Sequence, residues 1–201
     1  ITTEAAKYFW KAGKPVPMVV RGPTGAGTRS GPFHSISPES LLAHHPGIKV
    51  VAPANPYDAK GLLIASINDP NPVMFLEHKK LYRKPDLKME VPLGLYEVEI
   101  GKANIVKEGF DVTLVAWSGM VPTALEAAAT LNDEGISVEV IDLRSIFPID
   151  EETGLLLAMI TPFGVIRPRF LTEGVATATS IMQHHVQNFY AHLSDFTIMI
   201  A

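Results

Sequence analysis

The 201-residue sequence contains no cysteine, which excludes disulfide bonds, thiolate metal sites and a cysteine nucleophile. Lysine and arginine together number 17 against 21 acidic residues, and no window concentrates them enough to follow a phosphate backbone. The longest apolar stretch, residues 154–166, is interrupted by Thr161 and Pro162 and falls short of the roughly 20 residues that cross a bilayer. We therefore expect neither a nucleic-acid partner nor a membrane span.

Apolar residues make up 47% of the sequence, which is enough to build one large or two small hydrophobic cores. The chain opens at Ile1 rather than methionine, and residues 4–10 resemble the middle of a helix more than a signal or transit peptide. We therefore expect further sequence upstream. The absence of cysteine fits a reducing compartment, and the combination predicts a soluble, intracellular enzyme.

Two patterns of alternating strand and helix follow one another, separated by a polar stretch at about residues 77–96. This predicts an α/β protein with two three-layer α/β/α domains and mainly parallel sheets, over residues 1–95 and 96–201. In the first half, short apolar runs typical of strands buried on both faces lie at residues 17–20, 48–51 and 73–76. Asn55 and Pro56 form a helix start, as N-cap and first helical residue.

The second half predicts one clear βαβ unit. Residues 112–117 form a strand, a helix follows with apolar residues on one face, and residues 136–142 form the returning strand. Beyond Asp150 the pattern predicts a helix to Met159, a short strand near residues 163–166 and a last helix at about residues 174–192.

The most unusual segment is the glycine-rich stretch at residues 21–39, which follows a predicted strand and contains His34. Ligands of open α/β sheets bind at the carboxyl edge of the strands, where this segment would lie. Ser37 followed by Pro38 predicts a helix N-terminus close to His34, whose field favours a neutral imidazole suited to proton transfer. A tight connection with a structural histidine is the alternative. The spacing of the glycines matches neither common phosphate-binding motif.

Two further groups have ordinary interpretations. His78 follows Glu77 at the end of a predicted strand, where a surface pair is expected. Lys79, Lys80 and the two basic residues after Tyr82 form a small basic cluster, which predicts a solvated face or a docking surface for an acidic partner.

Ordered motifs between residues 15 and 153 carry a resemblance to a known family. They include Arg21-Gly22-Pro23, His34-Ser35, residues 46–51, residues 55–63, Leu81-Tyr82-Arg83, Gly101-Lys102-Ala103, residues 108–113 and residues 139–144. In this order they resemble the β subunit of the E1 component of thiamine-diphosphate-dependent 2-oxo acid dehydrogenases. Pyruvate, branched-chain and acetoin enzymes share these motifs.

The resemblance implies a partial pyrimidine-binding domain followed by a transketolase C-terminal-like domain. It implies thiamine diphosphate with Mg²⁺ shared with an α subunit in an α2β2 heterotetramer, a small 2-oxo acid substrate and acyl transfer to a lipoyl-bearing E2 component. His34 matches the family's active-site histidine, which orients or protonates the intermediate. Some members also hold a potassium ion through backbone oxygens, at positions that correspond to Met18, Ser66, Asp69 and Asn71.

The sequence departs from the family pattern in three ways. Ile36 stands where the family has glutamine after the His-Ser pair, the aminopyrimidine-binding residues lie upstream of Ile1, and agreement thins after Asp150. Either the chain is incomplete or its second domain has diverged. Two alternatives therefore stay open: a non-catalytic assembly module that binds the α subunit and E2, and another transketolase-like thiamine enzyme. The expected location is the cytoplasm of a prokaryote or the mitochondrial matrix of a eukaryote, with self-association of the chain.

Overall fold

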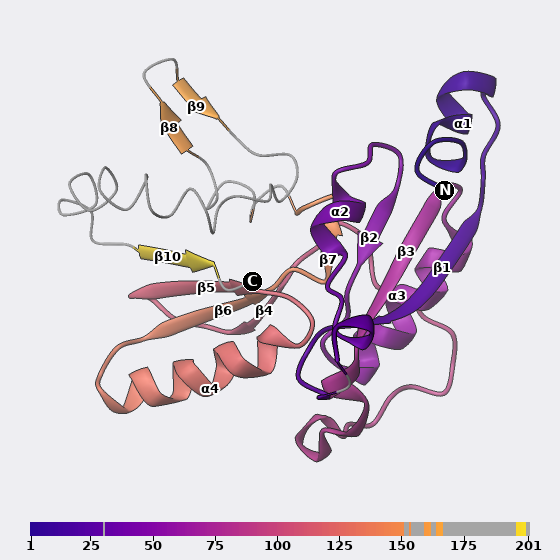
Figure 1. Cartoon of the computed structure of the whole chain (residues 1–201). Helices are drawn as coiled ribbons and strands as arrows, with labels where there is room; N and C mark the ends of the chain where they lie inside the picture. The colour runs from indigo at the N-terminus through magenta and orange to yellow at the C-terminus, as the bar shows by residue number, and fades with distance from the viewer. Residues whose placement is uncertain (30, 151–152, 154–158, 162–163, 167–195, 200–201) are drawn as a thin grey trace.

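The computed structural model describes residues 1–29, 31–150, 153, 159–161, 164–166 and 196–199. These residues form two main sheets and a short hairpin (Figure 1). The first sheet has the order β1-β3-β2-β7, with β1 at Met18–Thr24, β3 at Pro72–His78, β2 at Lys49–Val51 and β7 at Ser145–Phe147. The second has the order β10-β5-β6-β4, with β10 at Phe196–Met199, β5 at Val112–Ala116, β6 at Val138–Asp142 and β4 at Asn104–Lys107.

Both sheets are mainly parallel, as predicted. In the first sheet β1 and β2 run parallel to β3, and in the second β10 and β6 run parallel to β5. The two antiparallel pairs, β2 with β7 and β4 with β6, lie at sheet edges. Strand β7 belongs by sequence to the second half of the chain but pairs with β2 of the first sheet, so the main chain crosses back between the two sheets.

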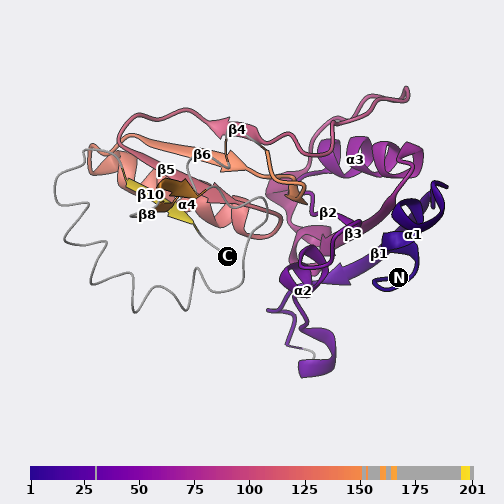
Figure 2. The ribbon, with the colours of Figure 1, turned by 90° about the horizontal axis from the view of Figure 1, so that it is seen from above.

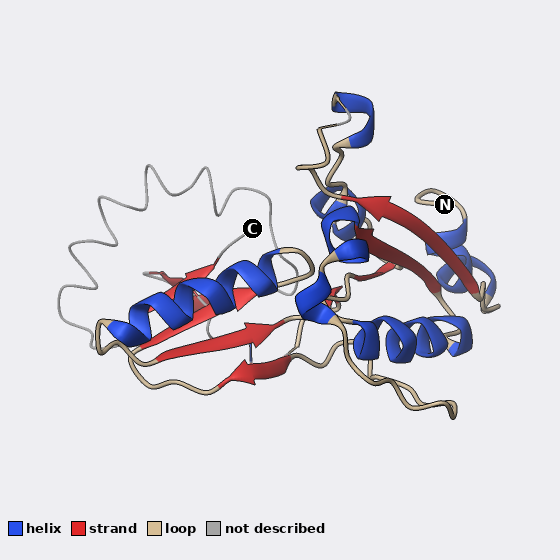
Figure 3. Ribbon diagram, turned by 90° about the horizontal axis from the view of Figure 1, so that it is seen from below, coloured by secondary structure: helices blue, strands red, loops and turns tan. Residues whose placement is uncertain are grey.

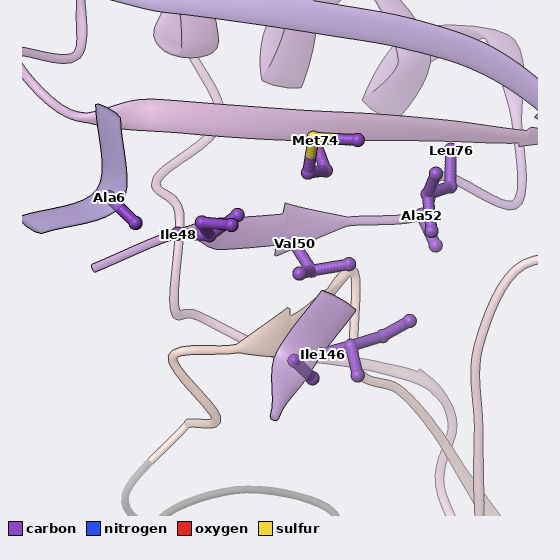
Figure 4. Close-up of a cluster of buried hydrophobic side chains, with 8 residues drawn as sticks. Ala6, Ile48, Val50, Ala52, Met74, Leu76 and Ile146 are labelled. Atoms are coloured by element: carbon purple, nitrogen blue, oxygen red, sulfur yellow. The ribbon is translucent and has the colours of Figure 1, made fainter. Parts of the chain in front are cut away.

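The first sheet is covered on both faces (Figure 2). Helices α1 (Ala5–Ala12) and α2 (Glu39–Ala43) pack on one face, where Ala6 and Ala43 join a cluster with Ile48, Val50 and Ile146 (Figure 4). Helix α3 (Pro56–Asn68) covers the other face through Leu62, which packs with Val51, Val73, Phe75 and Val98. The resulting three layers confirm the predicted α/β/α arrangement for this part of the chain.

The predicted βαβ unit is confirmed. Strand β5 leads into helix α4 (Met120–Asp133), and β6 returns parallel to β5. Val121, Ala124 and Ala128 of α4 are buried against the second sheet, so the helical spacing of apolar residues places one face of α4 on the sheet (Figure 3). Among the described residues, no helix combines the length and the apolar character needed to cross a membrane.

The first strand differs from its prediction. Strand β1 continues through Thr24, so residues 21–24 extend the strand instead of beginning a loop. It also lies at the edge of the sheet and only its last residue, Thr24, is buried, whereas β3 in the middle of the sheet is buried over residues 72–76. An apolar, β-branched run therefore indicated a strand correctly but not its burial, because burial depends on neighbours far away in sequence.

The segment after β3 contains two short 3-10 helices, η2 (Lys79–Arg83) and η3 (Pro85–Leu87), before the chain reaches β4. Toward the end of the chain, β8 (Met159–Thr161) and β9 (Gly164–Ile166) form an antiparallel hairpin. Strand β9 confirms the predicted strand near residues 163–166, and Met159, the predicted helix end, lies in a strand. The predicted last helix at about residues 174–192 lies outside the described residues.

Candidate functional site

His34 lies in the segment between the carboxyl end of β1 and helix α2, as the last residue of the 3-10 helix η1 (Pro32–His34). The turn is closed by backbone bonds from His34 N to Gly31 O and from Ser35 N to Pro32 O, and by Ser35 Oγ, which donates to Gly31 O at 2.8 Å. Gly31 has a φ of 76°, a conformation that glycine adopts more readily than other residues. Figures 2 and 3 show this segment extending away from both sheets.

The predicted helix start near His34 is wrong in its details. Helix α2 begins at Glu39 with Pro38 as its N-cap residue, and no side chain caps it. The helix has five residues, and Leu42 N donates to Pro38 O. Pro38 therefore occupies the N-cap position instead of the first helical position that was predicted for it.

The His34 segment, which we define as residues 25–38, is anchored at three places. Gly25 N donates to Ile36 O at 2.9 Å, which closes the segment at its base. The ammonium of Lys79 donates to the carbonyl oxygen of His34. The side chain of Lys80 lies so close to Gly27 that a methyl group on this glycine would be 1.9 Å from its Cε. The segment is thus held by residues that follow β3.

Large apolar side chains close to His34 in the sequence are exposed. Phe33 is 87% exposed, Leu41 63% and Ile36 59%. Leaving three such side chains in water forgoes the stabilisation that burial gives, which is typical of a surface that another polypeptide covers. Ile36, the departure from the family's glutamine, therefore adds apolar surface beside His34 in place of an amide.

His78 is a functional candidate that the sequence analysis missed. Its ring packs against both Gly25 and Gly119. A methyl group would lie 2.1 Å from a ring atom if added to Gly25 and 2.7 Å if added to Gly119. Its Nδ1 accepts a hydrogen bond from Lys80 N at 3.3 Å. Burial, and then the charges of Lys80 and Lys79, lower the pKa of His78 below its usual value. The position of His78 depends on two glycines that are distant in sequence and meet its ring only in the folded chain, so no local pattern indicated it.

Glu77, the residue expected to pair with His78, binds another partner. Arg21 forms two hydrogen bonds of 2.8 Å with the carboxylate of Glu77, and the Tyr82 hydroxyl donates to the same carboxylate at 3.1 Å. Burial and the negative charge of Glu77 raise the pKa of Tyr82. The network ties β1, β3 and η2 together beside the His34 segment.

A pocket of about 190 Å³ lies where β2 and β3 end. Its wall is mostly apolar, with Asn55, Glu77, His78 and Tyr82 as polar members, and His34 does not line it. The lining residues are Pro53, Ala54, Asn55, Pro56, Ala59, Glu77, His78, Leu81, Tyr82 and Leu87. The pocket therefore lies beside the His34 segment, and His34 is not part of it.

A buried charge cluster joins the two halves of the chain. The guanidinium of Arg144 lies 2.8 Å from the carboxylate of Asp58, near the start of α3, and Asp58 is 1% exposed. Arg144 N donates to the buried carboxylate of Asp142 at 3.0 Å. Asp58 also accepts from Asn55 Nδ2 at 2.5 Å, and Asn55 caps α3 as predicted. The guanidinium of Arg144 thus pairs with Asp58 and its backbone N–H binds Asp142, while burial raises the pKa of Asp142 to about 7.

This cluster predicts a pH-dependent effect of Asp142→Asn. The pKa of Asp142 is raised from 3.8 to about 7, so between these pH values the folded chain holds the proton more tightly than the unfolded chain. Stability from this group therefore falls as pH rises through that range. We expect the advantage of the variant over the natural chain to grow by on the order of 2 kcal/mol between pH 5 and pH 8.

Urea unfolding midpoints at pH 5, 6, 7 and 8 measure this effect. Asp86→Asn, at an exposed position of η3, serves as the matched control and should follow the natural chain at every pH. Parallel stability profiles for Asp142→Asn and the natural chain would contradict the prediction.

The four positions predicted for potassium come together at the α3–β3 turn. Asp69 N donates to Ser66 O, Asn71 N donates to the Asp69 carboxylate at 2.9 Å, and Met18 pairs with Pro72. Lys49 already places its ammonium on the carboxylate of Asp69. The four positions therefore lie near one another, while the only carboxylate among them has a positive partner in Lys49.

Comparison with known proteins places the chain in a family. Residues 3–85 match the family model described as the transketolase pyrimidine binding domain, and residues 101–193 match that of the transketolase C-terminal domain. A solved structure described as a split gene transketolase, inactive β4 tetramer, has a TM-score of 0.59 and 22% identity, covering 96% of this chain and 61% of its own. This structure supports the fold.

Curated relatives are closer in sequence. The pyruvate dehydrogenase E1 component subunit β of Acholeplasma laidlawii is 56% identical over 69% of this chain and 42% of its own length. That of Staphylococcus epidermidis is 51% identical over 76% and 47%. The acetoin:2,6-dichlorophenolindophenol oxidoreductase subunit β of Cupriavidus necator is 48% identical over 77% and 46%.

The chain thus spans less than half the length of these curated relatives. The two family models follow one another in the order that the sequence motifs predicted, and the boundary at residues 95 and 96 stays a prediction. The chain belongs to the transketolase-like family of 2-oxo acid dehydrogenase E1 β subunits.

Proposed function

We propose that this chain acts as the β subunit of the E1 component of a 2-oxo acid dehydrogenase complex. In this role it takes part, with an α subunit, in the oxidative decarboxylation of pyruvate or a branched-chain 2-oxo acid and in acyl transfer to lipoyl-E2. The observation that carries the proposal is the position of His34 at the carboxyl edge of β1, within a segment that matches the pyrimidine-binding domain. Open α/β sheets bind ligands at that edge.

The transketolase-like E1 family depends on thiamine diphosphate, and when bound this coenzyme supplies the carbanion chemistry. The chain fits one side of such a site, because the His34 segment presents an imidazole at the sheet edge among exposed apolar side chains. The diphosphate with its Mg²⁺ belongs in this proposal to the α subunit. A potassium ion at the α3–β3 turn remains part of the proposal.

The chemical role of His34 follows from its position. Its imidazole can donate a proton to, or accept one from, an oxygen of the bound 2-oxo acid. During acyl transfer the S–S bond of the lipoyl disulfide breaks as it takes up two electrons: one sulfur forms a thioester with the acyl carbon, which is oxidised, and the other becomes a thiolate that takes up a proton. We propose that His34 delivers the proton to the other sulfur.

The exposed apolar side chains near His34 in the sequence support binding to a partner subunit. Phe33, Ile36 and Leu41 remain exposed, and Phe9 and Trp10 on helix α1 are 58% and 89% exposed. We propose that the α subunit covers the first group in an α2β2 heterotetramer, which binds E2 and works in the cytoplasm of a prokaryote. The chain alone should then be nearly inert.

Reconstitution tests the proposal. The purified chain is mixed with a candidate α subunit, thiamine diphosphate and magnesium, and lipoyl-dependent oxidation of 2-oxo acids is measured. We expect turnover only when both chains are present. Steady turnover by this chain alone would contradict the division of the site between subunits, and a stable but inactive α–β complex would favour the non-catalytic assembly module.

A further inference from the structure

We propose that Lys79 is a positioning residue for His34, acting through the hydrogen bond that its ammonium donates to the carbonyl oxygen of His34. This inference rests on the proposed role of His34 in catalysis. The two residues are 45 positions apart in sequence and come from different parts of the first domain. A hydrogen bond from a charged donor is roughly twice as strong as one between neutral groups, which suits Lys79 to this role.

The base of the contact is rigid. Lys79 begins η2 directly after β3, and β3 pairs with β1 on one side and β2 on the other. Residues 72–76 of β3 are buried, which fixes the main chain from which the Lys79 side chain projects. The His34 end, in contrast, is a three-residue 3-10 helix in a segment that extends away from both sheets.

Lys79 does not act in isolation. The residues on either side of it also contact the His34 segment: the ring of His78 lies against Gly25, and the side chain of Lys80 lies against Gly27. Three consecutive residues therefore hold the segment at its base, at its first turn and at His34 itself. Of the three, only Lys79 bonds to the residue whose side chain would touch the substrate.

Position matters for a proton-transfer group, since a misplacement of about 1 Å can lower a rate roughly 10²-fold. Removing the ammonium leaves the sheet and η2 in place but releases the His34 carbonyl. The predicted consequence is a loss in kcat with little change in KM. If Lys79 instead attracted the anionic substrate by its charge, its removal would raise KM and leave kcat unchanged.

The test uses the reconstituted α–β complex. Lys79→Met should lower kcat about 10-fold, and Lys79→Arg, which keeps a charged donor, should restore most of the activity. Lys88→Met, at an exposed position beyond η3, is the matched control and should behave as the natural chain. In a His34→Ala background, Lys79→Met should cause no further loss, because Lys79 acts through His34.

Two results would overturn the inference: an equal fold-loss in both backgrounds, or a loss confined to KM. A second readout does not depend on activity. Cleavage by an arginine-specific protease at Arg29, an exposed residue of the His34 segment, should be faster in Lys79→Met than in the natural chain and in Lys88→Met. If the natural complex lacks 2-oxo acid turnover, the proposed function fails, and faster cleavage alone still supports the anchor. Unchanged cleavage would refute it.

Discussion

Replacing His34 with alanine lowers lipoyl-dependent oxidation of the 2-oxo acid about 10²- to 10⁴-fold in the reconstituted complex, the range expected for loss of a general acid–base group. The side chain lies at the end of a 3-10 helix in an exposed segment, so its removal costs little packing. The loss should therefore appear in kcat while the complex with the α subunit forms as before.

Two controls separate a chemical role from a structural one. His45→Ala removes an imidazole that follows α2 but is distant in sequence from the glycine-rich turn, and it should leave turnover unchanged. Co-purification with the α subunit measures assembly in each variant. Full activity of His34→Ala in an intact complex would exclude the catalytic role and favour the assembly function.

Arg144→Met destabilises the fold by about 3–5 kcal/mol, because it leaves the buried carboxylate of Asp58 without its cation. Asp58 and Asp142 are 1% and 0% exposed, and the Arg144 side chain is 16% exposed. The backbone at position 144 has a φ of 57°, but arginine and methionine share the same cost there. The expected loss thus comes from charge and not from backbone strain.

The size of this loss should depend on pH. Burial raises the pKa of Asp142 and the charge of Arg144 lowers it, so removing the guanidinium raises this pKa further and makes the penalty larger at pH 8 than at pH 5. Adding Asp58→Asn to Arg144→Met should recover part of the lost stability, since one uncompensated charge is removed. Urea unfolding of the single and double variants at both pH values provides the measurement. A pH-independent loss in Arg144→Met would instead point to packing.

The fold could be predicted well where local patterns decide it. Asn55 and Pro56 marked the start of α3 because capping involves residues within one turn, and the βαβ unit from β5 to β6 followed from apolar spacing. The exposure of β1 could not be predicted, because an edge strand and a central strand have similar composition.

The site was predictable only in part. His34 stood out in its glycine-rich context, and the family resemblance assigned it a role. The contacts of Lys79 and His78 with the His34 segment, and the ion pair of Arg144 with Asp58, join residues far apart in sequence. Such contacts depend on how β3 lies beside β1 and how the second half returns to the first, which no local pattern contains.

The return of β7 to the first sheet has a consequence for synthesis on the ribosome. Strand β7 cannot pair with β2, and Ile146 cannot pack in the cluster that contains Val50, until residue 147 has left the exit tunnel. Part of the apolar surface of the first sheet therefore stays uncovered while the β5–α4–β6 unit is translated. Nascent chains of this protein would expose a binding site for chaperones over that interval, and the two halves would reach their final form together.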